Sequence, residues 1–172
     1  MSRQRPARRV GGGAVVSPAL GVGSVLLGGV LLAGCGTGPV EVEAPTLGGA
    51  DARSCAALID AVPGRVGGHD RREVEGRGFA AAWGDPAIEL RCGVGRPAGF
   101  DKFATCQTVN GVDWYIPQSQ MTGEPADILM TTVGRAQNVE VRVPEDYWPP
   151  AATMVDLAAA IKHTIRPTDS CV

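Results

Sequence analysis

Few side chains in this 172-residue sequence are of the types that perform acid–base or nucleophilic catalysis. There are two histidines, His69 and His163, and only three serines after residue 34, namely Ser54, Ser119 and Ser170. None of these serines lies in a G-x-S-x-G or S-x-x-K pattern, and the H-E-x-x-H, P-loop and G-x-G-x-x-G patterns are missing. His69 lies in a polar, Gly-containing stretch that predicts a solvated loop. We therefore expect no catalytic set built on serine or histidine.

Carboxylates offer an alternative, in which two of Asp85, Glu89 and Asp113 act together in an envelope hydrolase or other enzyme. Each has a simpler structural role. Asp85 lies between glycine and proline, which is typical of a turn, and Asp113 is expected to face Thr108 across a hairpin. The carboxylate-pair enzyme is therefore the alternative to a non-enzymatic protein.

Five cysteines are the most informative reactive residues. If Cys35 carries a lipid, an even set remains for two disulfides: Cys55, Cys92, Cys106 and Cys171. Four cysteines allow three pairings, and the sequence alone does not choose among them. We predict Cys92 with Cys106, because both lie on expected strands, and Cys55 with Cys171, which would tie the ends of the domain together. No C-x-x-C occurs, so neither a metal nor a cofactor is expected.

The assignment of Cys35 depends on the segment before it. Four arginines occur within residues 1–9, and residues 10–33 carry no charge. The stretch Leu-Ala-Gly-Cys at 32–35 then resembles a bacterial lipobox, so residues 1–34 are predicted to be a lipoprotein signal peptide. An ordinary secretory signal and an uncleaved membrane helix are the alternatives, and the many glycines argue against the helix.

Removal of residues 1–34 would remove four Arg and no acid, leaving 12 basic and 18 acidic side chains and a net charge of −6. Such a chain lacks the basic surface of a nucleic-acid binder, and a covalent lipid at Cys35 rather than charge would hold it at a membrane. Residues 35–50, rich in Gly and Pro, are predicted to be a flexible tether, and residues 51–172 a single extracytoplasmic domain.

Hydrophobic periodicity predicts an α+β fold for this domain. Apolar residues recur at helical spacing over residues 54–62 and again between Pro149-Pro150 and Pro167. Between the two helices we expect an antiparallel sheet of about five or six strands, with both helices packed on one face. The expected strands cover residues 78–83, 88–94, 105–109, 112–116, 126–132 and 139–143, and Asn110-Gly111 predicts a two-residue hairpin turn.

Part of the chain resembles a known family. The stretch Trp-Gly-Asp-Pro at 83–86, continuing to Arg-Cys-Gly-Val at 91–94, resembles the actinobacterial secreted family named domain of unknown function 3515. Residues 109–114, 132–135 and 139–144 extend the resemblance, which covers most of residues 54–166. It implies an exported, often lipid-anchored envelope protein and transfers no catalytic residue.

These observations favour an accessory or binding protein on the outer face of the cytoplasmic membrane, with an envelope protein as its partner. The expected binding surface combines the hairpin end with the loop at residues 117–125, because aromatic and polar side chains beside a loop are common at recognition surfaces. Its candidate residues are Trp114, Tyr115, Gln118, Ser119 and Gln120.

Overall fold

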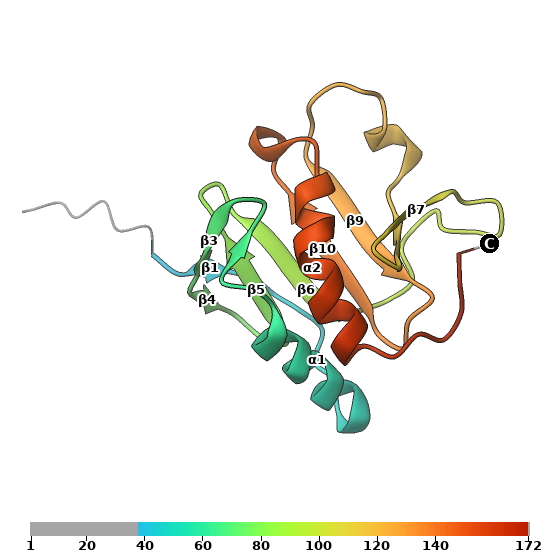
Figure 1. Cartoon of the computed structure of the whole chain (residues 1–172). Helices are drawn as coiled ribbons and strands as arrows, with labels where there is room; N and C mark the ends of the chain where they lie inside the picture. Colours follow the sequence, from blue (N-terminus) through green and yellow to red (C-terminus); the bar gives the residue numbers. More distant parts are fainter. Residues whose placement is uncertain (1–37, 172) are drawn as a thin grey trace, which may run out of the picture. The chain divides into compact units, whose positions relative to one another are not determined.

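The computed structural model describes residues 38–171, which form an α+β domain (Figure 1). Eight strands make one antiparallel sheet in the order β2-β3-β5-β6-β10-β9-β8-β7. The strands are β2 Arg65–Val66, β3 His69–Arg72, β5 Ala80–Trp83, β6 Ile88–Val94, β7 Cys106–Val109, β8 Val112–Tyr115, β9 Ile128–Val133 and β10 Asn138–Val143. The predicted fold class is confirmed, and the sheet is larger than expected because β2 and β3 were not predicted.

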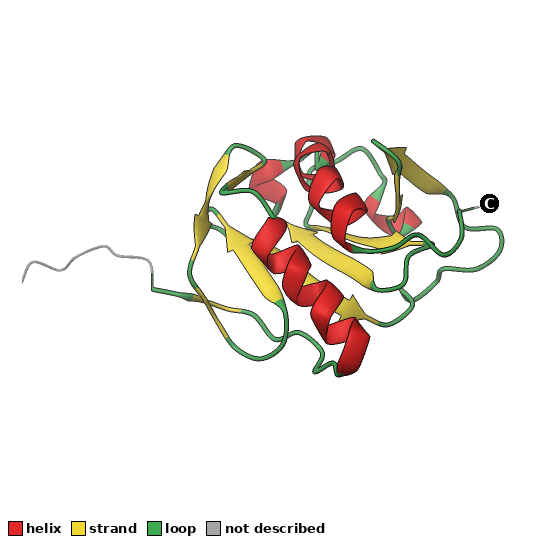
Figure 2. Ribbon diagram, turned by 60° about the horizontal axis from the view of Figure 1, so that its bottom comes forward, coloured by secondary structure: helices red, strands yellow, loops and turns green. Residues whose placement is uncertain are grey.

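Two helices cover one face of this sheet, as predicted (Figures 1 and 2). Helix α1 spans Gly49–Ala61 and helix α2 spans Ala151–Thr164. Alternate residues of β6 and β10 are buried beneath the helices, so each strand contributes one apolar row. The rows join the helix side chains in one core, which includes Leu58, Leu90, Val141, Leu157 and Ile161.

Strands β7 and β8 form the predicted hairpin. Val109 pairs with Val112 and Gln107 with Trp114, in the register that a two-residue turn requires. Asn110 and Gly111 have φ of 50° and 78°, the left-handed values that this turn needs. Trp114 packs in the same core as the side chains of the two helices, so it lies on the helix side of the sheet. Its neighbours Asp113 and Tyr115 lie on the opposite side, which we call the far face.

The predicted disulfide pairing is wrong. Cys55 in α1 is bonded to Cys92 in β6, with Cα atoms 5.7 Å apart, and Cys106 in β7 is bonded to Cys171, with Cα atoms 6.2 Å apart. Three strands separate β6 from β7 in the sheet, a distance of roughly 19 Å at about 4.8 Å per strand. Cys92 also faces the helices, whereas Cys106 is on the far face, so the predicted Cys92–Cys106 bond is geometrically impossible.

The predicted flexible tether is also wrong for residues 40–50. Strand β1, Val40–Glu41, pairs in parallel with β4, Val74–Glu75. The backbone N–H groups of Val40, Val42 and Ala44 donate to alternate carbonyls of residues 73–77, those of residues 73, 75 and 77, at 2.8 Å, and Val42 is 2% exposed. Helix α1 then begins at Gly49, five residues earlier than expected. Turn-forming composition misled the prediction, because pairing with a distant segment orders these residues.

Two predictions lie outside the described residues: the signal peptide at 1–34 and the lipid attachment at Cys35. Within residues 38–171, neither helix has the length and apolar character needed to span a bilayer.

Candidate functional site

The loop at residues 117–125 borders an apolar recess on the helix side of the domain. A single turn of 3-10 helix, η1 at Gln118–Gln120, forms the first part of the loop, and the side-chain carbonyl of Gln120 accepts the backbone N–H of Leu129 at 2.8 Å. This bond fixes the loop against β9. The recess has a volume of about 200 Å³, and its lining includes Ile116, Met121, Ile128, Trp148, Pro149 and Met154.

Met121 and Trp148 leave this recess partly open to solvent, being 42% and 37% exposed. Trp148 follows another short 3-10 turn, η2 at Glu145–Tyr147, and precedes two prolines, after which α2 begins. Gln107 reaches the same recess from β7, and its amide lies 3.7 Å from the Met121 sulfur. The recess thus combines an apolar floor with an amide at its rim.

The predicted aromatic surface does not form, because Trp114 and Tyr115 point to opposite faces of the sheet. Trp114 is fully buried in the core, and Tyr115 is 8% exposed on the far face, in edge contact with Phe100. Of the other predicted binding residues, Gln118 and Ser119 are exposed and Gln120 is half-buried. Only Gln120 of these five lines the recess.

Of the three candidate carboxylates, Asp113 and Glu89 are bound to other partners and Asp85 is exposed. Asp113 accepts the Thr108 hydroxyl at 2.6 Å and the backbone N–H of Cys171 at 3.0 Å, while Glu89 is paired with Arg142. Glu89 in β6 and Asp113 in β8 are three strand spacings apart, roughly 14 Å. Asp85 is exposed in the turn before β6, where its backbone N–H donates to the Tyr147 hydroxyl at 3.2 Å.

Charged side chains on the far face are paired across the central strands. Arg91 of β6 pairs with Glu140 of β10, and Arg142 of β10 pairs with Glu89 and, at 3.4 Å, with Asp127. The hydrogen bond to Glu89 is the main cause that raises the pKa of Arg142, and burial opposes it. These pairs form a ladder along the sheet and leave no unpaired carboxylate on these strands for acid–base work.

Arg135 is tied to the backbone. Its guanidinium donates to the carbonyls of Ile165 and Gly111, both at 2.8 Å. Burial lowers the pKa of Arg135, and the nearby charge of Asp113 acts in the opposite direction. Arg135 therefore ties the end of α2 to the hairpin turn, and Asp113 ties Cys171 to β8.

His69 lies in a strand, not in the predicted loop. It belongs to β3, and its ring stacks on Tyr147 with centroids 3.7 Å apart. No acidic partner orients it among the described residues. Within residues 38–171, no three His, Cys, Asp or Glu side chains are grouped closely enough to hold a metal ion.

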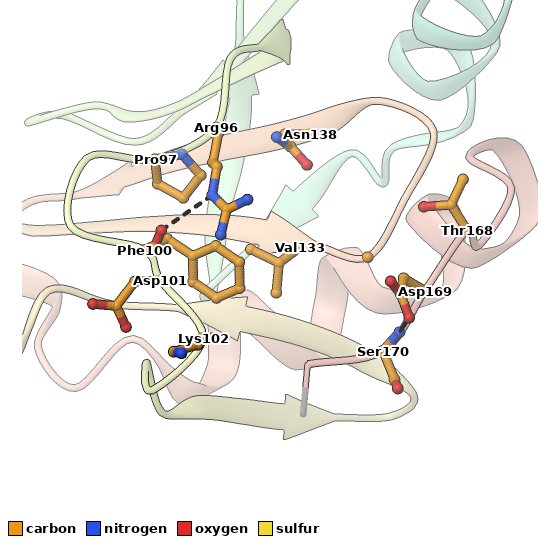
Figure 3. Close-up of a pocket in the computed structure, with 11 residues that line it drawn as sticks. Arg96, Pro97, Phe100, Asp101, Lys102, Val133, Asn138, Thr168, Asp169 and Ser170 are labelled. Carbon is orange, nitrogen blue, oxygen red and sulfur yellow. Dashed lines mark hydrogen bonds between the residues drawn. The ribbon is translucent and has the colours of Figure 1, made fainter.

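A larger cavity, about 440 Å³, lies where the loop at residues 95–104 meets the C-terminal segment at residues 168–170 (Figure 3). Its charged lining residues are Arg96, Asp101, Lys102 and Asp169. Sequence reasoning missed this cavity, since residues 95–104 were assigned to no helix, strand or site. The unassigned stretch between β6 and β7 was the available signal, because a long connection without regular structure is often functional.

Comparison with known proteins identifies one family. The family described as "Protein of unknown function (DUF3515)" matches residues 15–169, most of the chain. No curated protein and no solved structure matches.

Proposed function

Because the chain belongs to the DUF3515 family, which is described as being of unknown function, we propose a function from its own residues. The protein is a non-enzymatic accessory or binding protein of the cell envelope, anchored by a lipid at Cys35 on the outer face of the cytoplasmic membrane. It binds an envelope protein through the apolar recess beside residues 117–125.

The pairing of the cysteines supports a location outside the cytoplasm. All four cysteines after Cys35 are paired, and structural disulfides persist in oxidising compartments outside the cytoplasm. The charged and apolar stretches before the lipobox supply an export signal, and two acyl chains on Cys35 give stable anchoring. The domain then works within reach of the membrane.

The recess is the observation that carries the binding proposal. It places two partly exposed large apolar side chains, Met121 and Trp148, around a concave apolar floor. Aromatic residues and methionine are enriched at protein interfaces, where an apolar anchor of the partner fills such a pocket. The occupant we propose is therefore an apolar side chain of a partner protein, with the Gln107 amide bonding to the partner's backbone.

Photocrosslinking in intact cells tests this proposal. A photoreactive amino acid replaces Met121 in one variant and Val155 in another; Val155 is 50% exposed on α2 and does not line the recess. We expect the position-121 probe to capture a defined envelope protein and the position-155 probe not to capture it. Equal capture from both positions, or none from position 121, would contradict the proposal.

A further inference from the structure

We propose that the cavity between residues 95–104 and residues 168–170 binds a short peptide with free ends, a zwitterion whose carboxylate is held by Arg96. The volume of about 440 Å³ is within the range of small-molecule sites. This site is separate from the apolar recess, with which it shares no lining residue.

Arg96 provides the anchor for the carboxylate. Its Nε donates to the Phe100 carbonyl at 3.1 Å, and its Cζ lies 4.9 Å from the centroid of the Phe100 ring. Among residues 38–171, no hydrogen bond or ion pair involves its two terminal nitrogens. A guanidinium held in this way presents a planar pair of donors, which matches the two oxygens of a carboxylate.

An apolar surface lies beside this anchor. Figure 3 shows the Phe100 ring directly below the Arg96 guanidinium, with Val133 next to it. The ring is itself held in place by edge contact with Tyr115, at a centroid distance of 5.3 Å. A side chain attached near the bound carboxylate would therefore rest on Phe100 and Val133.

Polar groups occupy the opposite side of the cavity. Figure 3 shows Thr168 and Asp169, both in the C-terminal segment, across the cavity from Arg96. The Asp169 carboxylate accepts the Ser170 N–H at 2.9 Å through Oδ1, and its other oxygen remains able to accept an ammonium. The hydroxyl of Thr168 adds a further acceptor.

The balance of charge favours a zwitterion over a polyanion. Arg96 and Lys102 line the cavity together with Asp101 and Asp169, so the formal charge of the lining is zero. A phosphate dianion would gain from the two cations but would be repelled by both carboxylates. A ligand with one negative and one positive end meets an opposite charge at each end.

The cavity wall is fixed before any ligand binds. The N–H groups of Thr168 and Asp169 donate to the Gly134 carbonyl at 2.9 and 3.2 Å. Gly134 has φ of 70°, and a Cβ there would collide with the Asp169 carbonyl. The Cys106–Cys171 disulfide then fixes the end of this segment to β7. Such preorganisation reduces the entropy lost on binding.

Calorimetric titration of the full chain in detergent micelles tests the proposal with four probes. They are the tripeptide alanyl-alanyl-leucine, its C-terminal amide, its N-acetyl form and inorganic phosphate. We expect the free tripeptide to bind. The amide and the acetyl form should each bind with an affinity at least about tenfold lower, and phosphate should bind more weakly than the free tripeptide. The proposal would be overturned if the free tripeptide showed no saturable binding, or if its amide bound with the same affinity.

Matched variants identify the site. Arg96→Gln and Asp169→Asn should each weaken tripeptide binding about tenfold, because each removes one charged contact. Arg53→Gln and Asp60→Asn, both exposed on α1, serve as controls and should leave it unchanged. Arg96→Lys keeps the charge without the paired donors and guards against misfolding of the Gln variant; it too should bind more weakly. Parental affinity in Arg96→Lys and Arg96→Gln would reject this anchor, whereas crosslinking from position 121 tests the apolar recess independently.

Discussion

The carboxylate of Asp113 in β8 accepts the backbone N–H of Cys171, 58 residues further along the chain, at 3.0 Å. The other oxygen of the same carboxylate accepts the Thr108 hydroxyl at 2.6 Å. Asp113 thus joins the β7–β8 hairpin to the chain end at the point where the Cys106–Cys171 disulfide also joins them. A residue first considered as a catalytic carboxylate is in fact part of a structural connection.

Replacing Asp113 should therefore lower stability. We expect Asp113→Ala to reduce the free energy of unfolding by about 1 to 3 kcal/mol, because it removes the acceptor for two donors. Asp113→Asn keeps one carbonyl oxygen and should cost less. Denaturant titration measures both, with Asp60→Asn as the exposed control. Unchanged stability in Asp113→Ala would argue against this structural role.

Disulfide mapping should recover two linked peptide pairs under non-reducing conditions, one joining Cys55 to Cys92 and the other Cys106 to Cys171. Replacing Cys55 and Cys92 together by Ser should lower the unfolding free energy by about 2 to 4 kcal/mol, since the bond restricts the unfolded chain. A peptide linking Cys92 to Cys106 would be inconsistent with the strand order.

The two fully buried tryptophans Trp83 and Trp114 should respond differently to substitution by Phe. The Trp83 Nε1 donates to the Pro63 carbonyl at 2.9 Å, whereas the Trp114 Nε1 has no partner among the described residues. Trp83→Phe breaks a hydrogen bond and Trp114→Phe removes an unpaired donor, so the first should be the more destabilising by about 1 kcal/mol. Thermal and chemical unfolding of the pair measure the difference; equal losses would show that the bond contributes nothing.

The segment at residues 40–44 should be sensitive to Gly76→Ala. Gly76 has φ of 125°, and a Cβ at this position would collide with the Val42 carbonyl. We expect a loss of about 1 to 3 kcal/mol from backbone strain, together with faster amide hydrogen exchange at Val40 and Val42. Gly64→Ala is the matched control, because nothing lies within 4 Å of a Cβ at Gly64. Exchange rates that do not change at Val40 and Val42 would count against an ordered segment.

Lipid attachment is tested by Cys35→Ala. We expect the variant to remain unprocessed and to incorporate no radiolabelled fatty acid, because the thiol that accepts the lipid is missing. Gel mobility and membrane fractionation give the readout, with the parent chain alongside. If the variant were cleaved and fractionated like the parent, the proposed anchor would be wrong.

Local patterns were sufficient for much of the secondary structure. Asn110-Gly111 specified the hairpin and its register, because a two-residue turn leaves one pairing for the flanking residues. Alternation in β6 and helical spacing in α2 likewise predicted those elements within a few residues. In each case the interacting residues are neighbours in the sequence.

Only the tertiary structure decided which distant segments meet. Strands β10 and β9 lie between β6 and the β7–β8 hairpin, so Cys92 is far from Cys106. Pairing with residues 73–77 orders residues 40–44, although their composition resembles that of a linker. The cavity around Arg96 likewise joins residues 95–104 to a chain end some 70 positions later. Periodicity records contacts within one element, whereas the partner of each element is chosen by packing of the whole core, to which every buried residue contributes.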